Sequence, residues 1–357
     1  MEQKQDNKKI AQELLDKINK KDFKIYFVLP EITDKVVSQY EMYFHAKTLK
    51  NAGYNSVILT EKSEFQKPTW FEEELTDIEH VGLDGKQFNV TAVDILVMPE
   101  VFTNVMEQTK NLPCDRIVLA QSYDAMINSL LPSVTWKNFN IKNVITTSQI
   151  FKNFIEEYFG EGFNIKTYDV GIPDYFKESK LPKKPIISFV TRNGNDIFKV
   201  TKLFFLKYPN YRWVTFEHLN DLNREDFAEK LSESFAAVWI DRISSMGTFP
   251  LECMKSNTLP IGLIPDVQPE YIVDDSGAWT NNVYNLPNLI ANVLSRYLED
   301  NIPEEIYNTM KNVSSKYNQK NSAKQLIEIY GGFINDKIKL LENVIMENKE
   351  PKIKVNK

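Results

Sequence analysis

The segment 241–261 contains the residues whose types and spacing are best suited to chemistry. Asp241 follows an apolar run, Gly247 lies in the loop behind it, and Glu252 falls in the first turn of a helix expected to begin near Phe249. Free backbone N–H groups and the dipole at a helix start bind anions such as a diphosphate. A carboxylate there can accept hydrogen bonds from both hydroxyls of a ribose. The alternative is structural: Gly247 permits a tight turn and Glu252 stabilises the helix N-terminus.

Polar residues also follow two apolar runs in the first half of the chain. Glu100 comes directly after the run 94–99, and Gln121, Ser122, Tyr123 and Asp124 come directly after the run 116–120. If both runs are parallel strands, these side chains lie together at the carboxyl edge of one sheet, where open α/β sheets bind ligands. For Glu100 and Asp124 the alternative role is to cap a helix.

The elements that position these residues follow from the hydrophobic pattern. From residue 23 onward, short apolar runs rich in β-branched residues alternate with longer amphipathic segments, a pattern typical of βαβ units on a parallel sheet. We expect strands at 24–29, 56–60, 94–98, 116–120, 143–147, 186–191, 212–216, 236–240, 259–263 and 278–280. We expect helices at 37–51, 149–158, 196–208, 224–233, 249–256, 286–298 and 323–347.

The alternation is interrupted once, by a stretch at 177–185 that is rich in Lys and Pro. This composition is typical of an exposed linker. We therefore predict two Rossmann-like domains, at 1–172 and 185–320, that face each other across one cleft. A chain of 357 residues exceeds the size at which one hydrophobic core usually splits into two. The last segment, 321–357, is expected to form an outer helix and a tail, and this helix could return to the first domain.

Composition narrows the classes of function. The chain has 43 Lys and Arg residues against 49 Asp and Glu residues, so nothing in its charge favours duplex DNA as the main partner. Its two cysteines, Cys114 and Cys253, are far apart and have no zinc-ligand spacing. The first residues are too polar for a signal peptide, and no run approaches the ~18 apolar residues of a membrane span. We expect a cytoplasmic protein without a transmembrane segment.

The segment from Gly247 to Ile261, GTFPLECMKSNTLPI, resembles the donor-site signature of glycosyltransferase family 4. The resemblance implies a GT-B fold, and it implies that Glu252 binds the donor ribose as the last Glu of a Glu-x7-Glu motif. The first Glu of that motif falls on Ser244, so Asp241 or Ser245 could contact the transferred sugar instead. The resemblance also implies that the neighbouring loop residues Met246, Gly247 and Thr248 bind the donor.

A second resemblance lies at the start of the second half, in the segment 189–199. It is similar to the Gly-Arg-x4-Lys loop of the family, which implies that Arg192 and Lys199 neutralise the departing diphosphate. Fixed cations can stabilise the charge that develops on a leaving group without a metal ion. Lys202 competes with Lys199 for this role, and for each of these residues the alternative is a solvated surface charge. Leu219 lies where the family holds the nucleotide base.

The same resemblance implies an activity for the chain and a set of residues that bind the acceptor. The chain is expected to be a retaining glycosyltransferase that uses a nucleotide-sugar donor, with no metal and no other cofactor. Glu100, Gln121, Ser122 and Tyr123 resemble the acceptor-side loops of such enzymes. Asp274 and Asp275 do not follow a strand as the acidic pair of a metal-dependent GT-A enzyme does.

Two other functions stay open from the sequence. One is a glycosyltransferase that acts on a modified base in nucleic acid, although a sequence pI of about 5.4 does not favour it. The other is a degenerate GT-B protein that binds a nucleotide or a sugar without turnover, which is motivated by Ser244 at the position of a Glu. Neither the sugar nor the acceptor is indicated by the residues.

Overall fold

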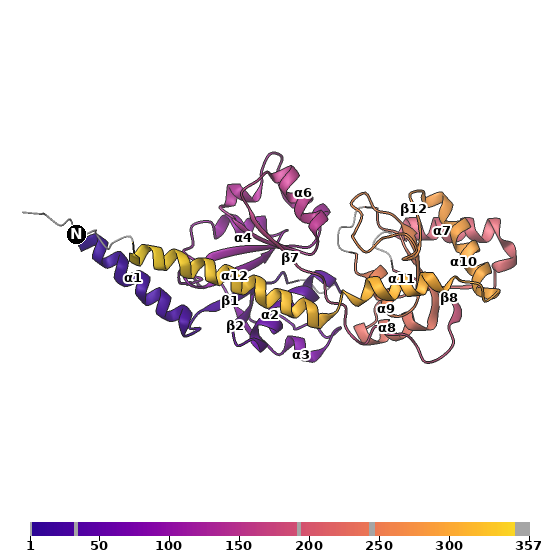
Figure 1. The fold of residues 1–357 in the computed structure, drawn as a ribbon, viewed down its shortest axis with the longest axis horizontal. Coiled ribbons are helices and arrows are strands. Elements are labelled where there is room, and N and C mark those ends of the chain that lie inside the picture. The colour runs from indigo at the N-terminus through magenta and orange to yellow at the C-terminus, as the bar shows by residue number, and fades with distance from the viewer. Residues whose placement is uncertain (1, 32–34, 191–193, 243–246, 347–357) are drawn as a thin grey trace, which may run out of the picture.

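The protein contains two parallel β-sheets, each covered by helices, and the predicted α/β fold class is confirmed (Figure 1). The computed structural model describes residues 2–31, 35–190, 194–242 and 247–346. The first sheet has seven strands in the order β3-β2-β1-β4-β5-β6-β7, and the second has five in the order β12-β11-β10-β8-β9. In both sheets the described strand pairs are parallel.

The first sheet is built from the first half of the chain. Its strands are β1 (Lys24–Val28), β2 (Asn55–Thr60), β3 (Glu79–Gly82), β4 (Ile95–Pro99), β5 (Asp115–Ala120), β6 (Asn143–Thr146) and β7 (Asn164–Thr167). The helices of this half are α1 (Glu2–Asn19), α2 (Val37–Asn51), α3 (Glu73–Thr76), α4 (Thr103–Gln108), α5 (Tyr123–Ser129) and α6 (Gln149–Phe159). The central strands β4 and β5 are almost wholly buried, as parallel strands between two helix layers must be.

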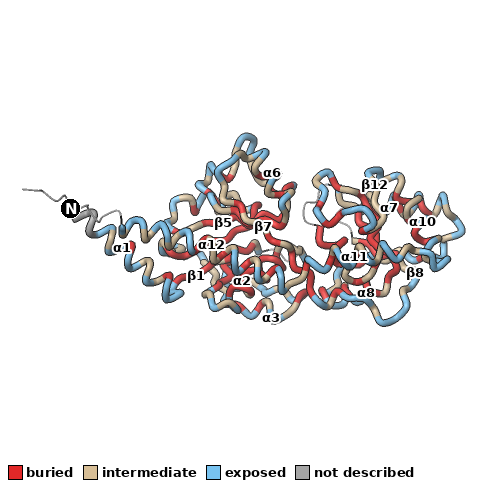
Figure 2. Tube along the Cα trace, in the orientation of Figure 1, coloured by how far each residue is buried: buried red, intermediate tan, exposed pale blue. Residues whose placement is uncertain are grey.

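The second sheet follows the segment that links the halves. Its strands are β8 (Lys184–Val190), β9 (Thr215–His218), β10 (Ser234–Trp239), β11 (Leu259–Leu263) and β12 (Ala278–Thr280). The helices that follow are α7 (Gly194–Lys207), α8 (Arg224–Glu233), α9 (Phe249–Lys255), α10 (Leu286–Leu298), α11 (Glu304–Ser315) and α12 (Gln319–Met346). Buried residues concentrate along the two sheets, and exposed residues lie on the outer faces of the helices (Figure 2).

Some elements differ from those expected. Strand β9 begins at Thr215 rather than at residue 212, because a 3-10 turn at Pro209–Tyr211 precedes it. The edge strands β3 and β7 were not expected from the sequence, since each has four residues and only one of the eight is buried. Helix α1 was not expected either, because its apolar residues are sparse among charges.

Helix α12 is the element that joins distant parts of the chain. Its residues Leu326, Tyr330 and Phe333 belong to the hydrophobic core of the first domain, and the helix contacts both α1 and α2 (Figure 1). It reaches that core because the chain crosses between the domains twice, at Ile172 and again at Tyr317. The Ile172 N–H donates to the Tyr317 carbonyl oxygen over 3.2 Å, so the two crossings lie side by side.

Candidate active site

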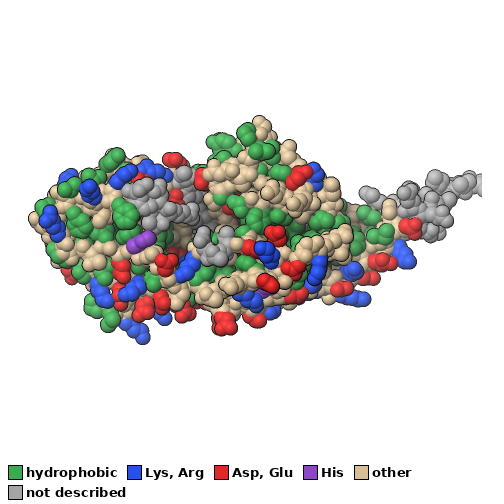
Figure 3. Space-filling model, turned by 180° about the vertical axis from the view of Figure 1, so that it is seen from behind, with side chains coloured by type: hydrophobic (Ala, Val, Ile, Leu, Met, Phe, Trp, Pro, Cys, Tyr) green, Lys and Arg blue, Asp and Glu red, His purple; other side chains and the backbone are tan. Residues whose placement is uncertain are grey.

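The strand order locates the ligand-binding edge of each sheet. The order reverses between β1 and β4 in the first sheet and between β8 and β10 in the second. Open α/β sheets bind ligands outside the carboxyl ends of the strands at such points. Glu100 follows β4 directly and Asp241 comes two residues after β10, so both predicted site residues lie at these points. From behind, the surface is hollowed between the two domains (Figure 3).

The two walls come within electrostatic range at Tyr123 and Asp241. Tyr123, the first residue of α5, is buried in the first domain. Burial, together with the carboxylates of Asp266, Asp124 and Asp241, raises the pKa of Tyr123 to about 12. Asp266 and Asp241 belong to the second domain, so the edge that carries Tyr123 faces the edge that carries Asp241.

The loop between β10 and α9, which is predicted to bind the donor and is called the donor loop below, is held at both ends. Residues 243–246, which include the predicted donor residues Ser244, Ser245 and Met246, lie outside the described residues. Before them, the Arg242 carbonyl oxygen accepts a hydrogen bond from the Asp266 N–H over 2.9 Å. After them, the Tyr271 hydroxyl donates to the Gly247 carbonyl oxygen. A Cβ at Gly247 would meet the Trp239 ring at 2.4 Å, so only glycine fits there.

Glu252 lies in the first turn of α9, as expected, and its side chain forms a buried ion pair. The Arg224 Nη1 donates to Glu252 Oε1 over 2.9 Å, with the Arg224 and Glu252 side chains 9% and 3% exposed. Burial lowers the pKa of the Arg224 guanidinium, but the Glu252 carboxylate together with Tyr175 and Tyr40 more than offsets this, so the pKa is raised and Arg224 stays charged. No sequence pattern pointed to Arg224, because Arg224 and Glu252 lie 28 positions apart on different helices.

Arg224 also contacts the first domain. Its backbone N–H donates to the Trp70 carbonyl oxygen over 2.8 Å, and its guanidinium lies 5.2 Å from the centre of the Tyr40 ring. A third contact, at 5.0 Å, is with the Phe176 ring in the linking segment. The ion pair with Glu252 is therefore part of the junction between the domains.

Of the predicted cations, the structure describes Lys199 and its competitor Lys202, which are both exposed on α7, but not Arg192, which lies outside the described residues. Arg242, which was not among the predicted site residues, is half-exposed beside the donor loop, and its Nε donates to Asp196 Oδ2 over 3.2 Å. It could have been noticed because it directly follows Asp241 after a strand. Leu219 is buried, and its N–H donates to the Phe189 carbonyl oxygen over 3.0 Å.

On the first domain, the expected acceptor-side residues lie close together. Glu100 Oε1 accepts a hydrogen bond from the Ser122 N–H over 2.8 Å, and Gln121 Nε2 donates to the Ser38 carbonyl oxygen over 3.2 Å. Burial raises the pKa of Glu100 to about 7, although backbone N–H groups that donate to it act in the opposite direction. Ser122 caps α5 by accepting from the Ala125 N–H over 3.3 Å.

Several polar atoms at this edge are buried without a partner in the described part of the chain. They are Gln39 Nε2, Glu100 Oε2, Gln121 Oε1, Thr146 Oγ1 and Thr147 Oγ1. Buried polar groups are normally hydrogen-bonded, so a concentration of unpaired ones marks a place where a ligand or water can supply the partners. Hydroxyl-rich molecules both donate and accept, as this mixture of amide, carboxyl and hydroxyl groups requires.

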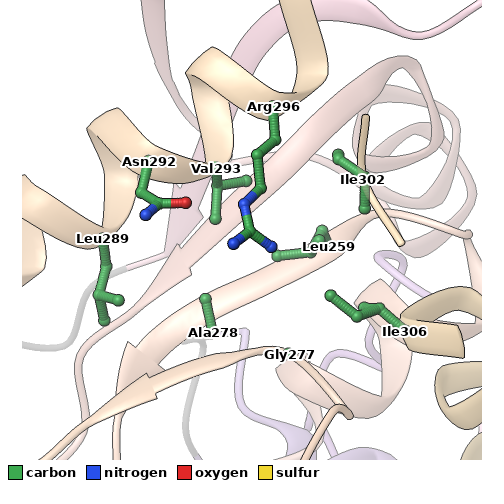
Figure 4. Close-up of a pocket in the computed structure, with 9 residues that line it drawn as sticks. All are labelled: Leu259, Gly277, Ala278, Leu289, Asn292, Val293, Arg296, Ile302 and Ile306. Atoms are coloured by element: carbon green, nitrogen blue, oxygen red, sulfur yellow. The ribbon is translucent and has the colours of Figure 1, made fainter. Parts of the chain in front are cut away.

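Other features of the described residues do not compete with this site. A cavity of about 230 Å³, with Arg296 above an apolar floor that includes Leu259 and Ala278, lies where β11 and β12 begin, at the opposite end of the strands (Figure 4). Among the described residues, no group of three or more His, Cys, Asp or Glu side chains could hold a metal ion. None of the described helices combines the length and the apolar character that a membrane span needs.

The comparison of folds decides the architecture. The structure resembles sucrose-phosphate synthase from Thermosynechococcus elongatus with a TM-score of 0.68 and 11% identity, over 88% of this chain and 99% of the other. It resembles Anabaena HepE in complex with UDP and glucose with a TM-score of 0.66 and 11% identity, over 87% and 99%. It also resembles a glycosyltransferase from Rickettsia africae, with a TM-score of 0.63 and 18% identity, over 88% of this chain and 99% of the other.

The chain has the GT-B fold. In sequence, the GT-B chain is similar to an alpha-1,6-glucosyltransferase of Actinobacillus pleuropneumoniae serotype 7. The two are 21% identical over 300 residues, which cover 82% of this chain and 89% of the relative. The resemblance to GT-B glycosyltransferases therefore extends to sequence as well as to fold. No protein-family model matches the chain.

Proposed function

We propose that this chain is a glycosyltransferase that moves a glucosyl group from UDP-glucose to a hydroxyl group of an acceptor. The sequence similarity to an alpha-1,6-glucosyltransferase supports this, because it covers 82% of the chain and hence most of both domains. The solved HepE complexes with UDP-glucose, and with UDP and glucose, support the choice of donor. One observation of the molecule carries the proposal: the carboxyl edges of the two sheets face each other, since Glu270, which follows β11, accepts a hydrogen bond from the Gln149 N–H, which follows β6, over 2.8 Å.

In this proposal the second domain binds the donor. Asp241, Gly247, Thr248 and the loop 243–246 surround the sugar and the diphosphate, and Leu219 borders the base. Arg192 and Lys199 stabilise the negative charge on the departing UDP, as the resemblance to family 4 implies. The carboxylate of Glu252 accepts from Arg224 through one oxygen, and its remaining lone pairs are available to the ribose hydroxyls.

The first domain binds the acceptor through Glu100, Gln121, Ser122 and Tyr123. We infer a neutral, hydroxyl-bearing acceptor, because the unpaired atoms at this edge include both donors and acceptors. The proposed reaction retains the anomeric configuration and needs no metal ion. The relative named for an alpha linkage supports retention, since UDP-glucose is itself α-configured. Deprotonation of the acceptor by the leaving diphosphate on the same face requires no separate protein base.

The test is release of UDP from UDP-glucose, with and without glucosides as acceptors, followed by NMR of the anomeric proton in the product. We expect acceptor-dependent UDP release, an α-linked product and unchanged rates in EDTA. Calorimetry with UDP is run in parallel. UDP binding without release under any condition would instead support a GT-B binding protein, the alternative that Ser244 motivates. Absence of UDP binding would overturn the proposal.

A further inference from the structure

A short segment of the second domain, residues 266–271, holds the donor loop at both ends; we call it the interdomain loop. It lies in the connection between β11 and β12. The Asp266 N–H donates to the Arg242 carbonyl oxygen over 2.9 Å, and the Tyr271 hydroxyl donates to the Gly247 carbonyl oxygen. These two carbonyl groups flank residues 243–246. The position of the interdomain loop therefore sets the position of both ends of the donor loop.

The same segment is docked on the first domain through Glu270. Glu270 Oε1 accepts hydrogen bonds from the Gln149 N–H over 2.8 Å and from the Ile150 N–H over 3.2 Å, at the start of α6. The first N–H groups of a helix have no partner within the helix, and a negative charge is favourable there. Helix α6 has no acidic residue in its own first turn, and the Ser148 side chain accepts from the Phe151 N–H, the third of the helix. Glu270 supplies the missing carboxylate from the other domain.

Two further contacts fix the segment. Val267 packs against the hydrophobic cluster of the first domain that contains Phe151. The Tyr271 ring lies 5.9 Å from the ring of Tyr317, in the segment through which the chain returns to the first domain. The space left where Glu270 and Tyr271 meet Thr147 and Ser148 is about 20 Å³, enough for about one water molecule, so the two domains are in close contact there.

We propose that Glu270 and Tyr271 are positioning residues that couple the docking of the two domains to the positions of Arg242 and Gly247, which flank the donor loop. This inference rests on the proposed function, because it takes Asp241 and Gly247 to bind the donor. Glu270 contacts the start of α6 in the first domain, and the Tyr271 hydroxyl donates to the Gly247 carbonyl oxygen, so a shift between the domains is transmitted to Gly247. Coupling of this kind is reciprocal, so a donor bound at Asp241 and Gly247 also strengthens the docking of Glu270 on α6.

The experiment compares Glu270→Ala, Tyr271→Phe and the double variant with Asp274→Ala, an exposed carboxylate of the same β11–β12 connection. Calorimetry with UDP and steady-state kinetics with UDP-glucose are the first readouts. We expect each single variant to weaken UDP binding about fivefold or more and to raise the donor KM more than it lowers kcat. The double variant should bind UDP about as tightly as the single variant with the lower affinity, because both changes act through one loop.

Hydrogen exchange without any ligand separates this inference from the proposed function. Glu270→Ala should speed amide exchange both at the start of α6 and in residues 247–254, whereas Asp274→Ala should change neither. If wild-type protein fails to bind UDP, the proposed function fails and the exchange data still decide the coupling. Faster exchange at α6 alone, with residues 247–254 and the UDP affinity unchanged, would reduce Glu270 to a local helix cap and overturn the inference.

Discussion

At the scale of single residues, the buried ion pair of Glu252 and Arg224 changes what Glu252 is expected to do for the fold. A carboxylate at the start of an exposed helix contributes only ~0.3–1 kcal/mol to stability. Here the carboxylate and the guanidinium are both buried, so the loss of one leaves the charge of the other without compensation. Glu252 is therefore a structural residue whatever its contact with the donor.

We expect Glu252→Gln to lower the free energy of unfolding by about 3 kcal/mol, because Arg224 keeps its charge in a buried site. Urea denaturation checks this value, with the exposed Glu229→Gln on α8 as the control. The double variant Glu252→Met with Arg224→Met should recover much of the loss, since it buries no charge. If Glu252→Gln unfolds at the same urea concentration as the wild type, the ion pair contributes nothing.

Glu41 gives a prediction for pH dependence. It is fully buried, and burial raises its pKa to about 7, although the hydrogen bond from Tyr168 and the charge of Arg224 act in the opposite direction. A carboxyl with a higher pKa in the folded state than its ordinary value of 4.5 destabilises the fold as the pH rises from about 4.5 to about 7. Glu41→Gln stays neutral and keeps an acceptor for the Tyr168 hydroxyl.

The variant should therefore be more stable than the wild type at about pH 8, by up to about 3 kcal/mol, and little different at about pH 4. Denaturation at both pH values measures this, and the exposed Glu305→Gln should show no such difference. Equal gains at the two pH values would mean that the charge of Glu41 is not responsible.

At the scale of elements, the donor loop depends on a close approach between its end and strand β10. The ring of Trp239, the last residue of β10, occupies the place where a side chain at residue 247 would begin. Both the ring and Gly247 are buried, so neither can move aside easily. The glycine is needed because of this contact, not merely to allow a turn.

We expect Gly247→Ala to cost about 1–3 kcal/mol of stability, because the new Cβ overlaps the Trp239 ring, and to weaken UDP binding as the loop shifts. Gly332→Ala on α12 is the matched control. A Cβ there meets nothing within 4 Å, so that variant should be neutral or stabilised by up to about 1 kcal/mol. Thermal melting and calorimetry measure both effects, and unchanged UDP affinity in Gly247→Ala would remove this contact from the donor site.

At the scale of the whole molecule, helix α12 completes the hydrophobic core of the domain that the first half of the chain forms. Tyr330 of α12 is fully buried, and its hydroxyl lies 3.2 Å from His45 Nδ1 on α2. Burial lowers the pKa of His45 to about 3, so this histidine is neutral inside the first core. The core of the first domain is therefore complete only when the chain has passed through the second domain and returned.

Leu326→Ala tests this dependence, because Leu326 is fully buried in the first core. We expect a loss of about 2–5 kcal/mol in the unfolding transition of the first domain, because the substitution leaves a cavity. Its neighbour Ile327, which is 37% exposed, is the control, and Ile327→Ala should cost less than about 1 kcal/mol. Equal losses for the two variants would show that α12 contributes no specific packing.

The sequence by itself determined the two Rossmann-like sheets and the strand-end positions of Glu100, Asp241 and the donor loop. These features follow from local patterns. The spacing of apolar residues, the residues that begin a helix and the polar residues that follow a strand can each be recognised within a few neighbouring positions. Even there, the short edge strands β3 and β7 carried too little pattern to be noticed. Only the tertiary structure decided that Glu252 pairs with Arg224, that Glu270 caps α6 and that α12 enters the first core. Each of these contacts joins residues from 28 to nearly 300 positions apart, and their meeting depends on how whole elements pack.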